Sequence, residues 1–178
     1  AAAVSFMRYV VRTCSAGLLG GRPDALVRDE VRAELVSYFR SAQESVLDVA
    51  AQHAAFALEI ASGIRDALLN SASPAAAEEF ARNASRARDW EHRADELVNA
   101  ARDQARHSER AQAYRDLIAA ADDIVDELEE AAFHLALIPH DARGDALYAA
   151  LRPLAALCVE SVQEYMKAVE TARTLHRG

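Results

Sequence analysis

Three short segments interrupt an otherwise continuous helical pattern in this sequence. Gly and Pro concentrate at residues 17–23, 70–74 and 139–144. Between these segments, apolar residues recur every three or four positions, which is the period of an α-helix with one buried face. Only 6 Gly and 4 Pro occur in 178 residues, whereas helix-favouring Ala, Leu, Arg and Glu are abundant. The pattern predicts an all-α protein of long helices joined by short loops.

The first long helical pattern, residues 24–70, is expected to be broken in two. As one helix it would be about 70 Å long at 1.5 Å per residue, which is too long for a compact domain. A break near Arg40 is plausible because Ser41-Ala-Gln-Glu44 has the form of a capping box. Residues 1–23 precede this pattern and are expected to form an N-terminal tail or docking segment.

Three further helices are expected after Asn70. The first begins at Pro74, with Ser73 as its N-cap, and runs to about His107. The second spans about 110–138, and Pro139 ends it. The last reaches about Leu175 and is expected to kink or to begin again at Pro153. Long helices with short connections predict one up-down antiparallel bundle with three to four core helices over residues 24–178.

The helical phase predicts which side chains form the core. For the helix at 110–138, the expected core stripe is Leu117, Ala121, Ile124, Leu128, Ala131 and Leu135, and Ile118, Val125 and Ala132 are expected to widen it on one side. Across the whole bundle, the expected core includes Phe56, Ile60, Trp90, Leu97, Ile124, Leu128 and Leu135.

Charge and apolar content exclude several classes of protein. The net charge of −8 argues against a surface that binds the phosphates of nucleic acids. Cys14 and Cys158 lack the spacing of a zinc site, and we expect reduced thiols. No run of 18 apolar residues is present, so we expect no membrane span and a cytoplasmic protein.

Two pairs of carboxylates stand four residues apart on consecutive helices. Glu91 and Asp95 form the first pair, and Asp122 and Asp126 the second. This spacing places both members of a pair on one face, where like charges repel by a few tenths of a kcal/mol. Both pairs flank the expected core stripes, so they are expected to meet in a groove. Such a groove would suit Mg²⁺, Mn²⁺, Fe or Zn²⁺.

Other interpretations of these acids remain open. With 28 Asp and Glu residues, pairs at this spacing also arise by chance on solvated helix faces. Two weaker pairs, Glu44/Asp48 and Glu160/Glu164, show how often the spacing recurs. None of the six histidines follows a Glu by three residues, so the Glu-x-x-His motif of di-iron bundles is absent.

Residues 91–137 resemble the PhoU-like proteins, in particular the PhoU-related regulators of phosphate transport. The matching segments are Glu91-His-Arg-Ala-Asp95-Glu-Leu and Ala121-Asp-Asp-Ile-Val-Asp126-Glu-Leu-Glu-Glu-Ala-Ala, which carry two (E/D)-x-x-x-D motifs in order. Tyr38-Phe39-Arg-Ser-Ala-Gln-Glu-Ser-Val is similar to the start of that family. The resemblance implies a bundle of long helices and a divalent or trivalent metal held by Glu91, Asp95, Asp122 and Asp126, with Asp123 able to substitute.

The resemblance also implies a non-catalytic role. Such a protein regulates phosphate uptake through a membrane transporter or its signalling partner, which would place it at the periphery of the inner membrane. Two alternatives remain: a carboxylate-bridged metalloenzyme on a four-helix bundle, and a metal-free dimeric helical adaptor.

Self-association follows from a departure from the family pattern. Family members usually carry two three-helix bundles, whereas one motif pair is clear here. A reduced bundle would leave apolar helix faces exposed, and such faces mark interfaces. We therefore expect a homo-oligomer that uses the last helix, through Leu154, Leu157, Val162, Tyr165 and Met166.

Overall fold

The protein is built from long α-helices and contains no β-strand in the part of the chain that the structure describes. The computed structural model describes residues 2–104, 109–138 and 145–177. Its helices are α1 (Ala2–Leu19), α2 (Asp24–Leu69), α3 (Ala76–Gln104), α4 (Glu109–Leu137) and α5 (Asp145–Arg177). The predicted all-α class is confirmed. None of the described helices has an apolar stretch long enough to cross a membrane.

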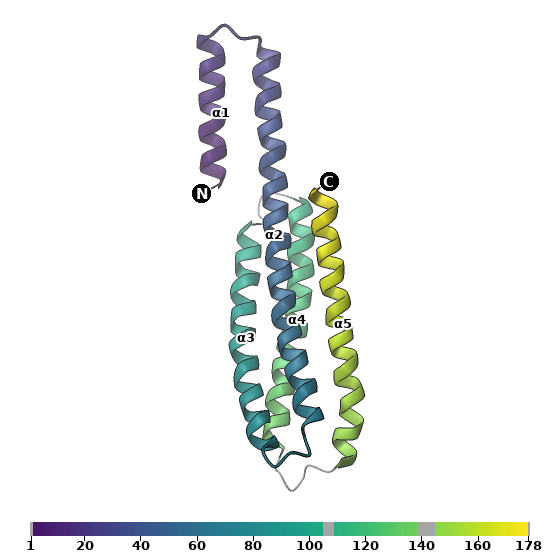
Figure 1. Cartoon of the computed structure of the whole chain (residues 1–178). Helices are drawn as coiled ribbons and strands as arrows, with labels where there is room; N and C mark the ends of the chain where they lie inside the picture. The colour runs from purple at the N-terminus through teal and green to yellow at the C-terminus, as the bar shows by residue number, and fades with distance from the viewer. Residues whose placement is uncertain (1, 105–108, 139–144, 178) are drawn as a thin grey trace.

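Helices α2 to α5 form an up-down antiparallel bundle (Figure 1). α2 contacts α3, α4 and α5, and α3 also contacts α4. α4 and α5, by contrast, are not closely packed against each other. One flank of the bundle is therefore less covered than the others.

α2 is a single unbroken helix of 46 residues, so the predicted break near Arg40 is wrong. Neither Pro nor Gly occurs between Asp24 and Gly63, and nothing in that stretch forces an end. The length argument assumed that the whole helix lies inside a compact domain. Instead, the N-terminal part of α2 projects beyond the bundle, with α1 beside it (Figure 1).

Residues 1–23 contribute helix α1, which packs on the projecting part of α2. The rings of Phe6 and Tyr38 stack with centroids 5.4 Å apart. Gly17 is buried, and a Cβ there would collide with the side chain of Val27, so glycine allows the two helices to approach closely. The chain then turns at Gly21, whose φ of 60° suits glycine.

α5 continues through Pro153, so the predicted new start there is wrong. A proline inside a helix removes one backbone hydrogen bond. The packing of α5 on α2 is present on both sides of that position, since Tyr148 and Ala155 are buried. Next to the proline, the Arg152 guanidinium donates to the Leu68 carbonyl oxygen (3.0 Å) and to Ser71 Oγ (2.9 Å). Arg152 thereby adds a side-chain donor to a carbonyl at the end of α2, which also accepts a long hydrogen bond from the Ser71 N–H (3.4 Å).

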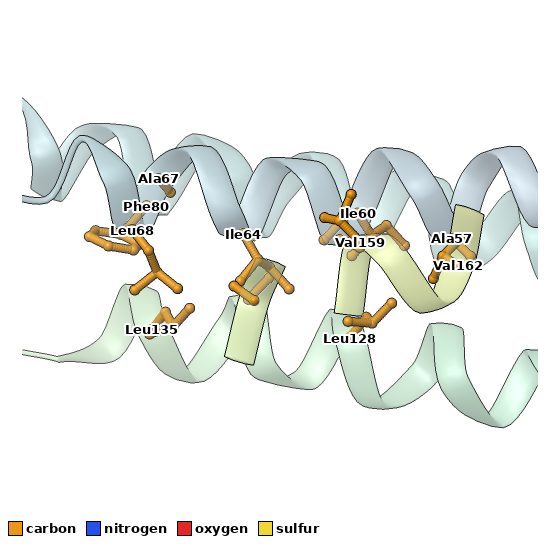
Figure 2. Close-up of a cluster of buried hydrophobic side chains, with 14 of the residues drawn as sticks. Ala57, Ile60, Ile64, Ala67, Leu68, Phe80, Leu128, Leu135, Val159 and Val162 are labelled. Carbon is orange, nitrogen blue, oxygen red and sulfur yellow. The ribbon is translucent and has the colours of Figure 1, made fainter. Parts of the chain in front are cut away.

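The core lies where α2 meets the other three bundle helices. Ile60, Ile64 and Leu68 of α2 face Leu128 and Leu135 of α4 in one buried cluster (Figure 2). α3 adds Phe80, and α5 adds Val159 and Val162. Many of the remaining buried side chains are alanines, which leave room for close helix packing.

Only one side of the predicted core stripe of α4 is buried, and the prediction is wrong for the other side. Ile124 is 51% exposed, and Leu117 is exposed as well. The buried face is made of Ile118, Ala121, Val125, Leu128, Ala132 and Leu135, all of which lie in the predicted widened stripe. Two apolar stripes lie side by side on this helix, and the sequence does not distinguish which one faces α2.

The remaining predicted core residues are placed as follows. Ile60, Leu128 and Leu135 are buried, as predicted. Phe56, Trp90 and Leu97 are partly buried and pack against the core clusters.

The corrected phase of α4 can be tested with a matched pair of truncations. Leu128→Ala should lower the free energy of unfolding by about 2–5 kcal/mol, because it opens a cavity in the core. Ile124→Ala, one turn earlier on the exposed stripe, should cost less than about 1 kcal/mol. Urea unfolding followed by circular dichroism measures both. Equal losses would contradict the assigned phase.

Candidate functional site

The four predicted metal ligands lie on two helices that pack directly against each other. Glu91 and Asp95 are on α3, and Asp122 and Asp126 are on α4. Because α3 and α4 run antiparallel (Figure 1), the start of one motif faces the end of the other. Glu91, which begins the motif on α3, is accordingly coupled electrostatically to Asp126, which ends the motif on α4.

Glu91 is partly buried, and its pKa is affected by acids on both helices. Its pKa is raised above the usual 4.5, first by partial desolvation and then by the charges of Asp95, Asp126 and Glu129. The neighbouring His92 acts in the opposite direction. A raised carboxyl pKa means that the charged form is disfavoured at this position.

Asp126 behaves in the same way from the side of α4. Its pKa is raised above the usual 3.8, again first by partial desolvation and then by Asp122 and Asp95. Coupling across the helix pair therefore joins both motifs into one group. We call this group the acidic seam: Glu91, Asp95, Asp122, Asp126 and Glu129.

One arginine partly neutralises the seam. Arg88 Nε lies 3.6 Å from Glu129 Oε1, across the α3–α4 contact. The Arg88 side chain is itself 69% exposed, so water screens this ion pair and its contribution is small. The same guanidinium lies 6.0 Å from the centre of the Phe133 ring. The seam therefore keeps a net negative charge.

Asp122 is directed toward the core rather than toward solvent. Its Oδ1 lies 3.0 Å from Nε2 of His53, and the Asp122 side chain is only 14% exposed. His53 is on α2 and is completely buried. Its second ring nitrogen, Nδ1, has no hydrogen-bond partner among the described residues. The pair thus joins the acidic seam to the helix at the centre of the bundle.

Sequence reasoning did not single out His53 as part of the site. One signal was present, since His53 occupies a position between Ala50 and Ala57 on the buried stripe of α2. A polar side chain on such a stripe usually has a hydrogen-bond partner. The identity of the partner, 69 residues away, cannot be inferred from spacing.

The donor chemistry of the seam suits a hard cation, but its geometry does not enclose one. Among the described residues, no three His, Cys, Asp or Glu side chains are arranged to hold a metal ion. The weaker pairs serve other contacts: Asp48 pairs with Arg173, and Glu164 pairs with Lys167. The seam is therefore a row of paired acids open to water.

The raised pKa values predict how the stability of the protein depends on pH. In the folded state Glu91 and Asp126 bind protons more tightly than in the unfolded state. The contribution of these two groups to the free energy of unfolding must therefore fall as pH rises from about 4 through the raised pKa values. Glu91→Gln/Asp126→Asn should remove this loss, so the variant should melt above the wild type at pH 7 and lose that advantage near pH 4.

The measurement is a series of thermal melts with chelator present. Asp89→Asn/Glu96→Gln is the control, since it removes two exposed acids from α3 outside the seam. A variant that melts below the wild type at pH 7 would contradict the assigned repulsion.

The His53–Asp122 contact predicts that truncating Asp122 lowers the stability of the fold more than truncating its neighbour Asp123. Asp122→Ala leaves both nitrogens of a buried ring without a partner, which should cost about 1–3 kcal/mol. Asp123→Ala removes an exposed neighbour and should change stability by about 0.5 kcal/mol or less. Equal effects in chemical denaturation would show that the contact adds nothing to stability.

Comparisons with known proteins found no significant match to this chain. No family model matches the chain, and neither the curated proteins nor the solved structures include a significant match.

Proposed function

We propose that this chain is a PhoU-like, non-catalytic regulator of phosphate transport that binds a divalent cation along its acidic seam. The observation that carries the cation-binding part is the coupling of both motifs across α3 and α4. The charge of Asp126 raises the pKa of Glu91, and the charge of Asp95 raises the pKa of Asp126. A cation beside these carboxylates would offset a repulsion that otherwise destabilises the folded chain.

The open geometry of the seam favours Mg²⁺ or Mn²⁺ among the expected metals. Mg²⁺ commonly binds through one or two carboxylates and keeps several water ligands. Such an ion does not need three protein ligands at one point, whereas a structural zinc site does. Two of the carboxylates Glu91, Asp95 and Asp126 would hold the ion, with water as its other ligands, because Asp122 is already paired with His53.

The regulatory part of the proposal is supported by the resemblance of residues 91–137 to PhoU-like proteins. The resemblance implies a transporter or its signalling partner as the target. A rigid bundle with one charged flank could respond to such a partner without catalysing a reaction. The cation would then set the charge of that flank, because each bound divalent ion neutralises two carboxylates.

The cation proposal is tested by the melting temperature. Saturating Mg²⁺ or Mn²⁺ should stabilise the wild type by mass action, by about 2.7 kcal/mol at a free concentration 100 times the Kd. Chelator should reverse the gain. Glu91→Gln/Asp126→Asn should lose the response to the ion, whereas Asp89→Asn/Glu96→Gln should keep it. A wild-type melting temperature that changes with neither the cations nor the chelator would support the metal-free adaptor instead.

The transport role requires a separate measurement. In the organism that carries this chain, its loss should change the rate of radiolabelled phosphate uptake. The seam variant Glu91→Gln/Asp126→Asn should reproduce part of that change at normal protein level. Unchanged uptake after complete loss of the chain would exclude the proposed target while leaving cation binding intact.

A further inference from the structure

The weakly covered flank of the bundle contains a long apolar groove. Two adjoining cavities of about 500 and 280 Å³ lie between α4 and α5, and both are lined by Leu128, Leu154 and Cys158. α2 forms the floor, because Ala57, Ala61, Ile64 and Leu68 also line them. We call this surface the apolar groove; its walls are Ile124, Leu128, Ala131 and Leu135 on α4, and Leu147, Leu151, Leu154, Leu157 and Cys158 on α5.

Large side chains in the groove are left in contact with water. Ile124, Leu154 and Leu157 are each more than half exposed. A run of exposed apolar side chains of this length is uncommon on a monomer and usually marks an interface. The Tyr165 hydroxyl, at one end of the groove, is buried without a hydrogen-bond partner among the described residues. An added helix would cover the exposed side chains Ile124, Leu154 and Leu157.

The rim of the groove is acidic. On α4, Glu127 stands three residues after Ile124 and four before Ala131, so it borders the groove, and it is exposed. Glu130 is nearby and contacts His134, which lines the groove. On α5, Glu160 and Glu164 flank the groove residues Leu157 and Ser161 at three-residue steps, although Glu164 is paired with Lys167. The groove therefore suits an apolar helix that carries positive charge.

α1 is a helix of this kind. Its exposed apolar residues Val4, Met7, Val11 and Leu18 follow three-, four- and seven-residue steps, and Cys14 fills the position between the last two. This is the stripe of a helix that packs against other helices. α1 also carries two exposed arginines, Arg8 and Arg12, and no Asp or Glu.

Most of the stripe on α1 is not used within one copy of the chain. α1 contacts its own α2 through Phe6 and Gly17 among others, and at the end of the stripe Cys14 and Leu18 line a small cavity together with α2. It lies beside the projecting part of α2, outside the bundle (Figure 1). To reach its own groove, α1 would have to detach from α2. A second copy can present the same stripe without that loss.

We propose that the apolar groove of one copy binds α1 of a second copy. The lengths agree: α1 has 18 residues, and the groove extends along α5 from Leu147 to Tyr165, so each is about 27 Å long. The signs of charge are opposite. An amphipathic helix lying in an apolar groove is a common mode of recognition. Because each copy has one groove and one α1, reciprocal exchange about a two-fold axis would close a dimer.

The two cysteines of the chain provide a direct test. Cys14 lies on the α1 stripe and Cys158 lies in the groove, and both are free thiols. A short bismaleimide cross-linker should join them between copies of the full chain, giving a dimer band on a denaturing gel. Neither Cys14→Ser nor Cys158→Ser should give that band alone. An equal mixture of the two variants should restore it, since each supplies one of the two thiols.

A dimer band from either single variant would overturn the proposal, because it would require contact between like cysteines. No band from the mixture, or a strictly monomeric wild type in sedimentation at tens of micromolar, would overturn it as well.

A second pair of variants separates docking from folding. Met7→Glu/Val11→Glu changes two exposed α1 side chains and should weaken dimerisation at least about tenfold while leaving the melt of the bundle unchanged. Val36→Glu is the control, since Val36 is exposed on α2 outside both surfaces. Retained dimerisation by the α1 variant would contradict the proposal. A monomeric wild type that binds phosphatidylserine vesicles, together with an α1 variant that no longer binds them, would assign the stripe to an anionic membrane surface instead.

Discussion

The structure depends on the burial of one continuous face of α2. This helix packs closely on all three other bundle helices, and its buried side chains extend from Val46 to Leu68. α5 in particular is held by α2, since it is not closely packed on α4. Hydrophobic burial along one helix is thus the shared source of stability for the whole bundle. The open flank between α4 and α5 is a direct result of this arrangement.

The orientation of α4 on that face separates two kinds of surface. Ala121 and Val125 are buried in the core, and the helix has one side on either side of them. One flank carries Asp122 and Asp126 toward α3, and the other carries Ile124 and Ala131 toward α5. The acidic seam and the apolar groove therefore lie on opposite sides of one helix. A cation on one side and a helix on the other would not compete for space.

The sequence predicted the features that depend on local pattern. Helix type, antiparallel order and the proximity of Glu91 to Asp126 follow from periodicity and from the loops, because these set which faces meet. The continuity of α2 did not follow, since only the tertiary structure shows that half of the helix lies outside the bundle. The prediction for α4 included Ile124 and Val125 but did not choose between their two sides of the stripe, because both continue an apolar pattern and the choice depends on the neighbouring helices. His53 and Asp122 are far apart in the chain, so no spacing rule joins them.

The length of α2 also means that protection against solvent exchange differs along a single helix. Amide hydrogens near Ile60 and Leu68 can exchange only when the bundle opens, whereas those near Leu26 and Val36 need only local fraying, because their side chains are exposed. The cooperative unit of unfolding therefore ends partway along a continuous helix. The N-terminal arm, α1 with the first turns of α2, can lose and regain order while the bundle below it stays folded.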